Sequence, residues 1–547
     1  MPKPWILLFL VLGLRAEDVS TKEPIPEALM PSAQIGHCHY TVTTDKPMAQ
    51  AYFNQGLAFV YDYSYRSAKR SFEEALKADP ECAMAHWGIA LANGNTINST
   101  NIDETSTDSA LQALEKAQQA RHVSPLEQEL IAAQKARFAV PAPTNRESLN
   151  LEYANAMRQA WHRHPKDATM GVLFADALID CHPWDQWTYD GKPKDGTVEL
   201  MKTVDEVLRL EPSNLHALHL YIHAYEASPF PEKAKFAADR LENLAPGLSH
   251  LQHMPCHIYA HTGDWDKGVE ANLNCLRAGD AYLASRNMLD RRGILFDHYE
   301  VALIYAACMR GQRALAVSTA EGIFKDKTPQ QVVEEFPDMD GEAAVALEVL
   351  KRFGEWDAIL ATPDFGTNNP ISNAIRAGDR AIAFAVKGRL QDAAREQERL
   401  DTLFFSFPES QLLGLDNVRK LLSVHRHLVA GEILIRRPES ELIGLEELRK
   451  ARDEQDHLHY SEPPQWIIPA RHSLGAALIR TGKFREAVKV YKEDLRRNPR
   501  NGWSLAGMAK AYRAMGRDKQ AEKYTREFRI AWKDADVPIT SSCLCLP

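Results

Sequence analysis

The feature that most constrains this 547-residue chain is a recurring order of small and aromatic residues that closes on a proline. The first clear segment contains Tyr52, Gly56, Phe59, Ala68, Phe72 and Ala75 before Pro80. The second contains Leu474, Gly475, Leu478, Ala487 and Tyr491 before Pro499. Both segments therefore predict the same local structure.

Small residues at these spacings let two helices approach closely, while aromatic residues fill the remaining space. One such pair cannot bury its apolar face alone, so pairs must stack on one another. The spacing matches the tetratricopeptide (TPR) repeat, which is about 34 residues long. Further pairs are readable at 83–136, 151–180, 214–245, 248–279, 294–324, 341–359, 370–402, 415–449 and 502–530. We expect an all-α fold of TPR helix-turn-helix repeats, stacked into a right-handed superhelical solenoid over residues 48–533.

Composition agrees with a folded protein, since hydrophobic residues make up 45% and charged residues 25% of the chain. The net charge of -9 is spread along the chain without a dense Lys/Arg block, which disfavours a nucleic-acid partner.

The chain begins with an apolar run at residues 5–14, too short to span a bilayer but typical of a signal peptide. We expect a signal peptide at 1–16 with cleavage after Ala16, an N-terminal extension at 17–47 and a C-terminal tail at 534–547. These expectations predict a secreted or periplasmic protein with no integral membrane segment after cleavage.

Eight scattered cysteines contain no Cys-x-x-Cys pair and predict one disulfide or none. The short segments His37-Cys-His39 and Cys543-Leu-Cys545 are weak metal-binding patterns, because neither has a matching second pair. Residues 181–196 break the repeat with several Pro and Gly residues, so we expect an ordered loop there. Trp184 and Trp187 in that loop either face a ligand or, more commonly for such residues, pin the loop to a helix.

Histidines concentrate in the middle of the chain. Residues 216–261 hold seven of the 20 histidines, where an even distribution would place about two. The pairs His219/His223 and His253/His257 lie 34 residues apart, which is one full repeat. His216, His250 and, after an insertion, His298 fall at another shared position, the one that holds Trp in the TPR template, in three successive repeats.

Residues four apart share a helix face, and packed helices lie about 8 to 10 Å apart, so the four paired imidazoles can meet. Glu226 shares the face of His219 and His223, as a further ligand or as an acceptor behind the ligands. Pro255 should kink the helix that carries His253 and His257. The predicted metal-ligating residues are His219, His223, His253, His257, Glu226, His250 and His298.

Imidazole ligands suit transition metals, so the expected ion is Zn, Cu or Fe, and the scarcity of carboxylates argues against Mg or Ca. The alternative is a ladder of neutral imidazoles that satisfy one another through hydrogen bonds in a non-catalytic protein. A buried histidine must find a partner, and several at equivalent places are hard to satisfy together, which favours the metal.

The chain resembles the large, mostly uncharacterised bacterial TPR proteins that carry a His-Met-Pro-x-His-Ile-Tyr motif. The resemblance rests on residues 50–57, 83–94, 221–228, 253–259 and 501–505, and the motif falls on His253 and His257. It departs from the family pattern at His86 and at 296–299. The resemblance implies the TPR fold and no particular reaction.

Two functions remain open from the sequence. The first is a metalloprotein, or a metalloenzyme with a small-molecule substrate, whose site lies between the central repeats. The second is a TPR scaffold that binds a protein or peptide partner in its concave groove. A third reading, an enzyme with a covalent nucleophile, lacks support, because the chain contains no Gly-x-Ser-x-Gly motif. It also contains no Walker A loop.

Overall fold

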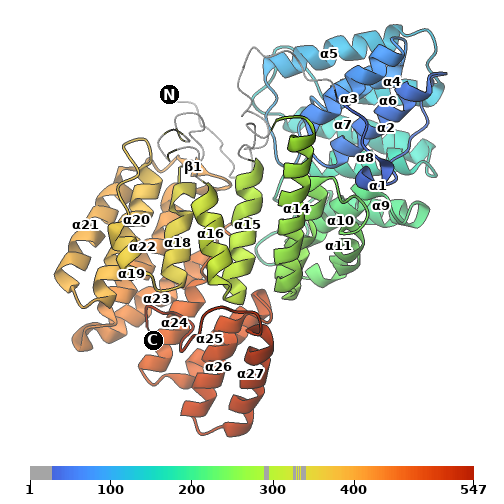
Figure 1. The fold of residues 1–547 in the computed structure, drawn as a ribbon. Coiled ribbons are helices and arrows are strands. Elements are labelled where there is room, and N and C mark those ends of the chain that lie inside the picture. Colours follow the sequence, from blue (N-terminus) through green and yellow to red (C-terminus); the bar gives the residue numbers. More distant parts are fainter. Residues whose placement is uncertain are drawn as a thin grey trace. The chain divides into compact units, whose positions relative to one another are not determined.

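The computed structural model describes residues 27–288, 295–323, 328, 331, 333 and 340–546. The described chain is built almost entirely of helices, apart from the two-residue strands β1 (Leu412–Leu413) and β2 (Asp416–Asn417), which pair antiparallel (Figure 1). It forms two compact units, which are described separately. The N-terminal unit contains residues 27–258 and 270–288, and the C-terminal unit contains 259–269 and the described residues from 295 onward.

The helices up to the unit boundary follow one another with short connections. They are α1 (Ser32–Ile35), α2 (Pro47–Tyr61), α3 (Tyr65–Ala78), α4 (Ala83–Leu91), α5 (Glu104–Gln119), α6 (Pro125–Lys135), α7 (Glu147–Arg163), α8 (Ala168–Ile179), α9 (Thr197–Leu210), α10 (Leu215–Glu226), η2 (Pro231–Ala234), α11 (Lys235–Leu241), α12 (Ser249–His253), α13 (Pro255–Thr262) and α14 (Trp265–Ser285). The division between the units crosses α13 and α14.

The remaining helices belong to the C-terminal unit. They are α15 (Leu295–Arg310), α16 (Arg313–Ile323), η5 (Glu342–Ala344), α18 (Val345–Arg352), α19 (Trp356–Ala361), α20 (Pro370–Val386), α21 (Leu390–Ser406), α22 (Val418–Leu434), η6 (Pro438–Ser440), α23 (Glu441–Asp456), α24 (Ala470–Arg480), α25 (Phe484–Arg497), α26 (Gly502–Ala514) and α27 (Asp518–Ala531).

The repeat pattern acts through aromatic residues wedged against glycines. The Phe72 ring of α3 lies where a Cβ on Gly56 of α2 or Gly88 of α4 would stand, about 2.5 Å from each. Tyr491 of α25 meets Gly475 of α24 and Gly507 of α26 in the same way. Each fully buried ring contributes about 1.5 to 3 kcal/mol, and a side chain on either glycine would displace it. The small-aromatic pattern thus sets the helix spacing in both units.

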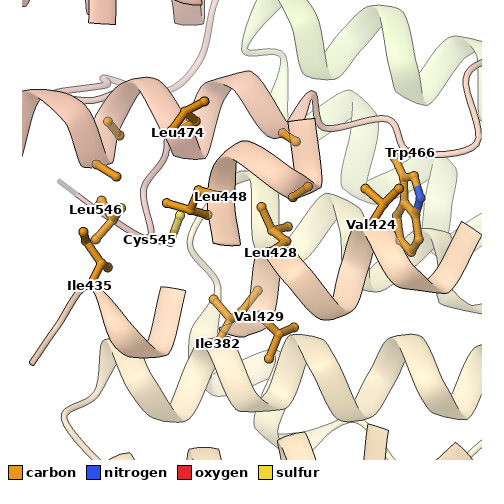
Figure 2. Close-up of a cluster of buried hydrophobic side chains, with 14 of the residues drawn as sticks. Ile382, Val424, Leu428, Val429, Ile435, Leu448, Trp466, Leu474, Cys545 and Leu546 are labelled. Carbon is orange, nitrogen blue, oxygen red and sulfur yellow. The ribbon is translucent and has the colours of Figure 1, made fainter. Parts of the chain in front are cut away.

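The C-terminal unit has a continuous apolar core between successive helix pairs. Figure 2 shows Ile382 of α20 beside Val429 of α22, and Leu448 of α23 beside Cys545 of the tail. All four side chains are buried. Because each pair buries its apolar face only against its neighbours, the stack behaves as one cooperative array.

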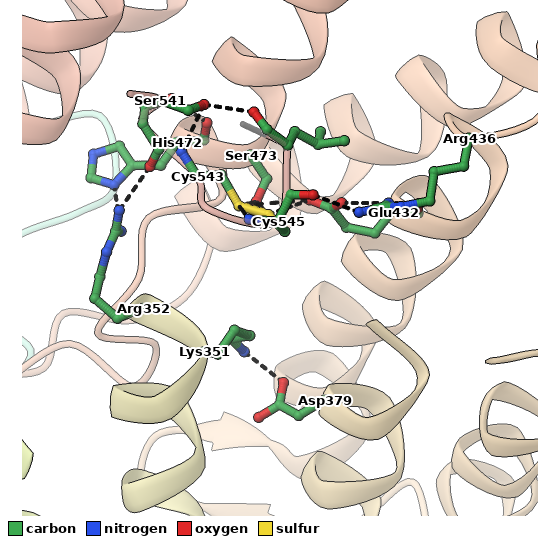
Figure 3. Close-up of a disulfide and its surroundings, with 12 residues drawn as sticks. Lys351, Arg352, Asp379, Glu432, Arg436, His472, Ser473, Ser541, Cys543 and Cys545 are labelled. Atoms are coloured by element: carbon green, nitrogen blue, oxygen red, sulfur yellow. Dashed lines mark hydrogen bonds and ion pairs between the residues drawn. A yellow bond between two sulfur atoms is a disulfide. The ribbon is translucent and has the colours of Figure 1, made fainter. Parts of the chain in front are cut away.

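The tail is part of this core. Cys543 and Cys545 form a disulfide, and the other cysteines of the described chain take part in none, which confirms the expectation of at most one bridge (Figure 3). Arg436, just after α22, donates to the Cys545 carbonyl at 2.6 Å, and Ser542 lies 2.7 Å from the Tyr491 hydroxyl. The tail therefore packs against helices of the C-terminal repeats and adds to their core.

The expected all-α fold of stacked TPR helix pairs is confirmed. The proposed signal peptide lies outside the described residues and stays a prediction. Within the described part of the chain, no helix combines the length and the apolar character needed to cross a lipid bilayer.

Candidate metal centre

Helix α10 presents the first histidines on one face. Asn214 caps the helix by accepting a hydrogen bond from the Ala217 N–H at 2.9 Å, which fixes where the helix begins. From that start, His216, His219, His223 and Glu226 follow at intervals of three and four and share one face. Every residue of α10 is buried, so all four polar side chains must find partners inside the protein.

The protonated nitrogen of His219 is set by a contact from α2. Its Nδ1 lies 3.0 Å from the backbone carbonyl of Tyr61, which can only accept a hydrogen bond. Burial, followed by repulsion from His223, His250 and His216, lowers the pKa of His219 well below its usual value. The ring is therefore neutral with its hydrogen on Nδ1, and Nε2 carries a lone pair.

Glu226 sets the tautomer of His223. The Nδ1 atom of His223 lies 2.7 Å from the Glu226 carboxylate. Burial acts to raise the pKa of Glu226, but attraction by His223 and His257 outweighs it and lowers the pKa to about 2. Because the ionised carboxylate only accepts, Nδ1 of His223 donates, and in the neutral form of the ring Nε2 carries a lone pair.

These two lone pairs face each other. His219 Nε2 and His223 Nε2 are 3.1 Å apart, which is hydrogen-bond distance, yet with both rings neutral neither atom carries a hydrogen to share. His250 adds a third nitrogen, since its Nε2 lies 3.2 Å from His219 Nε2. The three imidazoles offer nitrogen atoms that all lie within 4.8 Å of one another.

His250 is positioned by a residue from the end of α2. The buried carboxylate of Asp62 accepts from the backbone N–H of Leu251 at 3.0 Å and so caps the first turn of α12. Burial raises the pKa of Asp62 to about 7, although backbone hydrogen bonds from α12 act against the rise.

His253 and His257 form a second pair. As expected, Pro255 interrupts their helix: α12 ends at His253 and α13 begins at Pro255. The two Nε2 atoms are 2.9 Å apart, and His257 Nδ1 contacts the second oxygen of Glu226. His253 Nδ1 lies 2.7 Å from the side-chain amide of Asn272, which can donate or accept depending on its orientation. Hydrogen bonds alone can satisfy this pair, unlike the His219–His223 pair.

Two aromatic side chains in strained backbone conformations lie against the histidines. Tyr63 has a φ of 55°, and its ring centroid lies 4.6 Å from that of His219 and 5.1 Å from that of His250. Trp184 has a φ of 59° and lies 5.3 Å from His223. Positive φ in a bulky residue is uncommon and concentrates at functional sites. Trp184 therefore faces the cluster, while Trp187 pins the loop by donating to the Ala224 carbonyl at 3.0 Å.

Six of the seven predicted ligand residues belong to the N-terminal unit and lie close together within it: His219, His223, Glu226, His250, His253 and His257. Glu226 lies behind the ligand nitrogens, because its two oxygens accept from Nδ1 of His223 and His257. This position is the outer-partner role considered for it from the sequence. The seventh residue, His298, lies on α15 in the C-terminal unit.

Sequence reasoning missed the residues that orient the imidazoles. The Tyr61 carbonyl, Asp62 and Asn272 come from α2 and α14, outside the histidine-rich segment. A backbone carbonyl leaves no signal in the sequence. An acidic residue directly after an apolar helix, such as Asp62, does leave one, since a buried carboxylate there needs a hydrogen-bond donor from another segment. Elsewhere, His39 bonds to Thr41 and Asn54 through its two ring nitrogens, which accounts for it locally.

In sequence, the tetratricopeptide repeat family matches residues 470–502, which cover α24 and α25. No curated protein sequence matches the chain.

Many solved structures match the chain in fold. One is the human IFIT1 dimer with m7Gppp-AAAA, at 13% identity and a TM-score of 0.34, covering 90% of this chain and 91% of that one. Another is the APC/C hetero-tetramer Cut9-Hcn1, at 11% identity and a TM-score of 0.28, covering 90% and 76%. A third is the TPR domain of P58(IPK), at 13% identity and a TM-score of 0.23, covering 86% and 99%.

Proposed function

We propose that the protein binds a transition-metal ion through the Nε2 atoms of His219, His223 and His250. The observation that carries the proposal is the 3.1 Å approach of His219 Nε2 and His223 Nε2. When both rings are neutral, both Nδ1–H groups already donate to atoms that can only accept, so two lone pairs face each other in a buried site. A cation between them removes the repulsion and satisfies both nitrogens.

The distances suit a metal. Imidazole nitrogens bind Zn at about 2.0 to 2.1 Å, so two ligands of a tetrahedral ion lie about 3.3 to 3.4 Å apart. The two Nε2 separations, 3.1 Å and 3.2 Å, are close to that value. Glu226 accepts from the far nitrogen of His223, as carboxylates commonly do behind metal-bound imidazoles.

An all-imidazole set with a carboxylate behind it favours Zn, Cu or Fe over Mg or Ca. Three protein ligands leave a tetrahedral position for water or substrate, which is the pattern of catalytic rather than structural sites. A metal-bound water there supports hydrolysis or oxidation. The identity of the metal would select which of these reactions to assay.

Elemental analysis of the untagged protein after extensive dialysis tests the proposal. About one transition-metal ion per chain is expected, and the double variant His219→Ala/His223→Ala should lose it. The matched control is His427→Ala, because His427 also bonds to carboxylates, Glu447 and Glu454, but contacts no second histidine in the described chain.

A chain without bound metal, which also fails to bind added Zn, Cu or Fe, would reject the proposal. The same conclusion would follow if the double variant retained the metal of the parent protein. Retention of metal in the His427→Ala control, with loss in the double variant, would place the ion at α10.

The second candidate is a non-catalytic scaffold that binds a peptide. It is favoured by a cleft of about 410 Å³ in the C-terminal unit, whose lining includes Phe404, Lys420 and Glu454 from α21, α22 and α23. An apolar ring with charges of both signs suits an extended peptide. Binding of the parent to a peptide array, lost in Phe404→Ala/Lys420→Glu, would support this function, and an array without bound peptides would exclude it.

A further inference from the structure

A second group of buried polar residues lies at the carboxyl ends of α4, α6 and α8. Asn95 follows α4, Arg137 follows α6, Asp180 caps α8, and Arg146 precedes α7. Their exposed fractions are 1%, 2%, 1% and 4%. Two buried guanidinium groups in one place require partners, because an unpaired buried charge is costly.

Arg137 organises the group. It donates to the Asn95 carbonyl at 2.5 Å and to the Asp180 carboxylate at 2.7 Å, and its own carbonyl accepts from Arg146. Gly94 makes the approach feasible, since a Cβ there would lie 2.6 Å from an Arg137 guanidinium nitrogen. The side chains are therefore held in place by contacts that use only part of their hydrogen-bonding capacity.

The unused capacity is concentrated here. No atom of the described chain bonds to Arg146 Nε and Nη1, Arg137 Nε, either amide atom of Asn95, or the second oxygen of Asp180. Arg146 also forms no ion pair within the described residues, although it lies close enough to Asp180 to influence that carboxyl. Most of these atoms are N–H donors, and one binding group with several acceptor oxygens would satisfy them.

Arginines outnumber carboxyls in the group, which sets Arg137 and Arg146 beside Asp180. Burial, then repulsion from Asp176, raises the pKa of Asp180 well above its usual value despite the opposing attraction of Arg137 and Arg146. Burial, then repulsion from Arg137, lowers the pKa of Arg146 to about 10, so it remains charged at neutral pH. The group thus places two guanidinium groups beside one carboxyl whose ionised form burial disfavours, with Asp176 one helical turn away on α8.

Two buried arginines in the C-terminal unit differ from Arg146. Arg471 binds Asp456 with both terminal nitrogens at 2.5 Å. Arg352 bonds to His472 at 2.9 Å and to the Ser542 carbonyl at 2.7 Å (Figure 3). In each, both terminal guanidinium nitrogens have partners, whereas buried Arg376 of α20 resembles Arg146 in that its Nη1 has none within the described chain.

We propose that Arg146, Arg137 and Asn95 bind a small oxyanion, namely the carboxylate or phosphate group of a small-molecule ligand. Guanidinium groups bind such oxygens in pairs with charge-assisted hydrogen bonds. The unpartnered Asn95 amide adds a donor beside them.

The oxyanion site is near the histidines. Asp176 bonds to His216 at 3.1 Å, and it lies one helical turn before Asp180 on α8. Because the site uses no histidine, it does not depend on the proposed metal. If both sites are occupied, the metal would act on the remainder of an anionic ligand.

The test compares phosphate and acetate at constant ionic strength, with chloride as the reference, using chelator-treated protein. The background is the full-length His219→Ala/His223→Ala variant, in which the proposed metal cannot hold the anion. Calorimetry should show saturable binding of at least one anion, and a stronger response to phosphate or to acetate would identify the group. A response no larger than that to chloride for both anions would overturn the proposal.

Arg146→Met in the same background should weaken anion binding at least tenfold. Its melting temperature without anion should not fall, because the substitution removes an unpaired buried charge. The matched control is Arg158→Met, since Arg158 is half-buried and pairs with Glu199. Unchanged anion affinity in Arg146→Met would reject the site.

A second variant guards against a misfolded Arg146→Met protein. Asn95→Asp places a carboxylate of nearly the same shape beside the guanidinium groups. It should abolish the anion response while leaving the protein folded by circular dichroism. A folded Asn95→Asp protein that binds the anion as the parent does would also overturn the proposal.

Discussion

His219 and His472 are both completely buried imidazoles on TPR helices, yet their surroundings differ. His472 of α24 accepts from Arg352 at Nδ1, at 2.9 Å, and donates from Nε2 to Asp494 at 3.0 Å. Each ring nitrogen of His472 therefore has a matching partner: Nδ1 accepts from a donor, and the Nε2–H group donates to an acceptor. His219 instead donates from Nδ1 and turns its lone pair toward the lone pair of His223.

The comparison teaches that a buried histidine is not in itself evidence of a metal. What distinguishes the two regions is the partner of the far nitrogen. In a neutral ring whose far nitrogen donates to such a partner, the near nitrogen carries a lone pair, and two such nitrogens in contact are the arrangement from which we propose a bound cation. In the C-terminal unit His472 has a donor and an acceptor as partners, whereas in the N-terminal unit His219 and His223 face each other.

The largest expected effect is on His472. Replacing it with Ala leaves Asp494 and Arg352 buried without this partner, and breaking such a contact costs about 3 to 5 kcal/mol of unfolding free energy. Urea denaturation should show this loss with the metal content unchanged. The metal-free His219→Ala/His223→Ala protein should lose less than His472→Ala, and an equal loss would remove the distinction between the two regions.

Glu226→Gln should weaken metal binding about 10- to 100-fold, because outer partners orient and polarise metal-bound imidazoles. A glutamine can accept from only one of His223 and His257 through its oxygen. Glu447→Gln, which alters the carboxylate beside His427, should bind metal as the parent protein does. Competition titration with a metal indicator measures both, and equal affinities would show that Glu226 has no such role.

The third prediction concerns pH. Burial acts to raise the pKa of Asp494, but attraction and hydrogen bonds from His472 and other neighbours outweigh it and lower the pKa to about 2. Its contribution to stability is present above the unfolded pKa near 3.8 and is lost as the pH falls toward 2. A shift of this size corresponds to about 2 kcal/mol.

The pKa of His472 also lies below its usual value, mainly because of burial, so protonation of the unfolded state below about pH 6.5 destabilises the fold in the same direction. Denaturation at a series of pH values should show both losses. In Asp494→Asn the loss between pH 4 and 2 should shrink, and an unchanged acid limb would contradict the assignment.

The smallest expected effect is the difference in unfolding free energy between two Tyr→Phe variants, one in each unit. The Tyr491 hydroxyl lies 2.7 Å from Ser542, whereas the buried Tyr63 hydroxyl has no partner in the described chain. Tyr491→Phe should therefore cost about 1 kcal/mol, and Tyr63→Phe should be neutral or stabilising by up to about 1 kcal/mol. Thermal denaturation of the metal-free variants compares them, and equal losses would mean that Tyr63 is satisfied as Tyr491 is.

Much of the fold was readable from the sequence. The Gly56–Phe72 and Gly475–Tyr491 spacings predicted helix pairs in contact, because a missing Cβ and a large ring leave few other ways to pack. The positions of His219, His223, His253 and His257 predicted facing imidazoles, since helix periodicity and repeat length fix which side chains point the same way.

Only the tertiary structure decided which groups those histidines contact. The choice between a neutral ladder and a metal site turns on which nitrogen carries the hydrogen, and that is set by the Tyr61 carbonyl, 158 positions away in the sequence from His219, and by the shared Glu226. The arginine group is likewise assembled from the ends of four helices, α4, α6, α7 and α8. Periodicity specifies a helix face because it is local, whereas hydrogen-bond partners and desolvation depend on segments that only folding brings together.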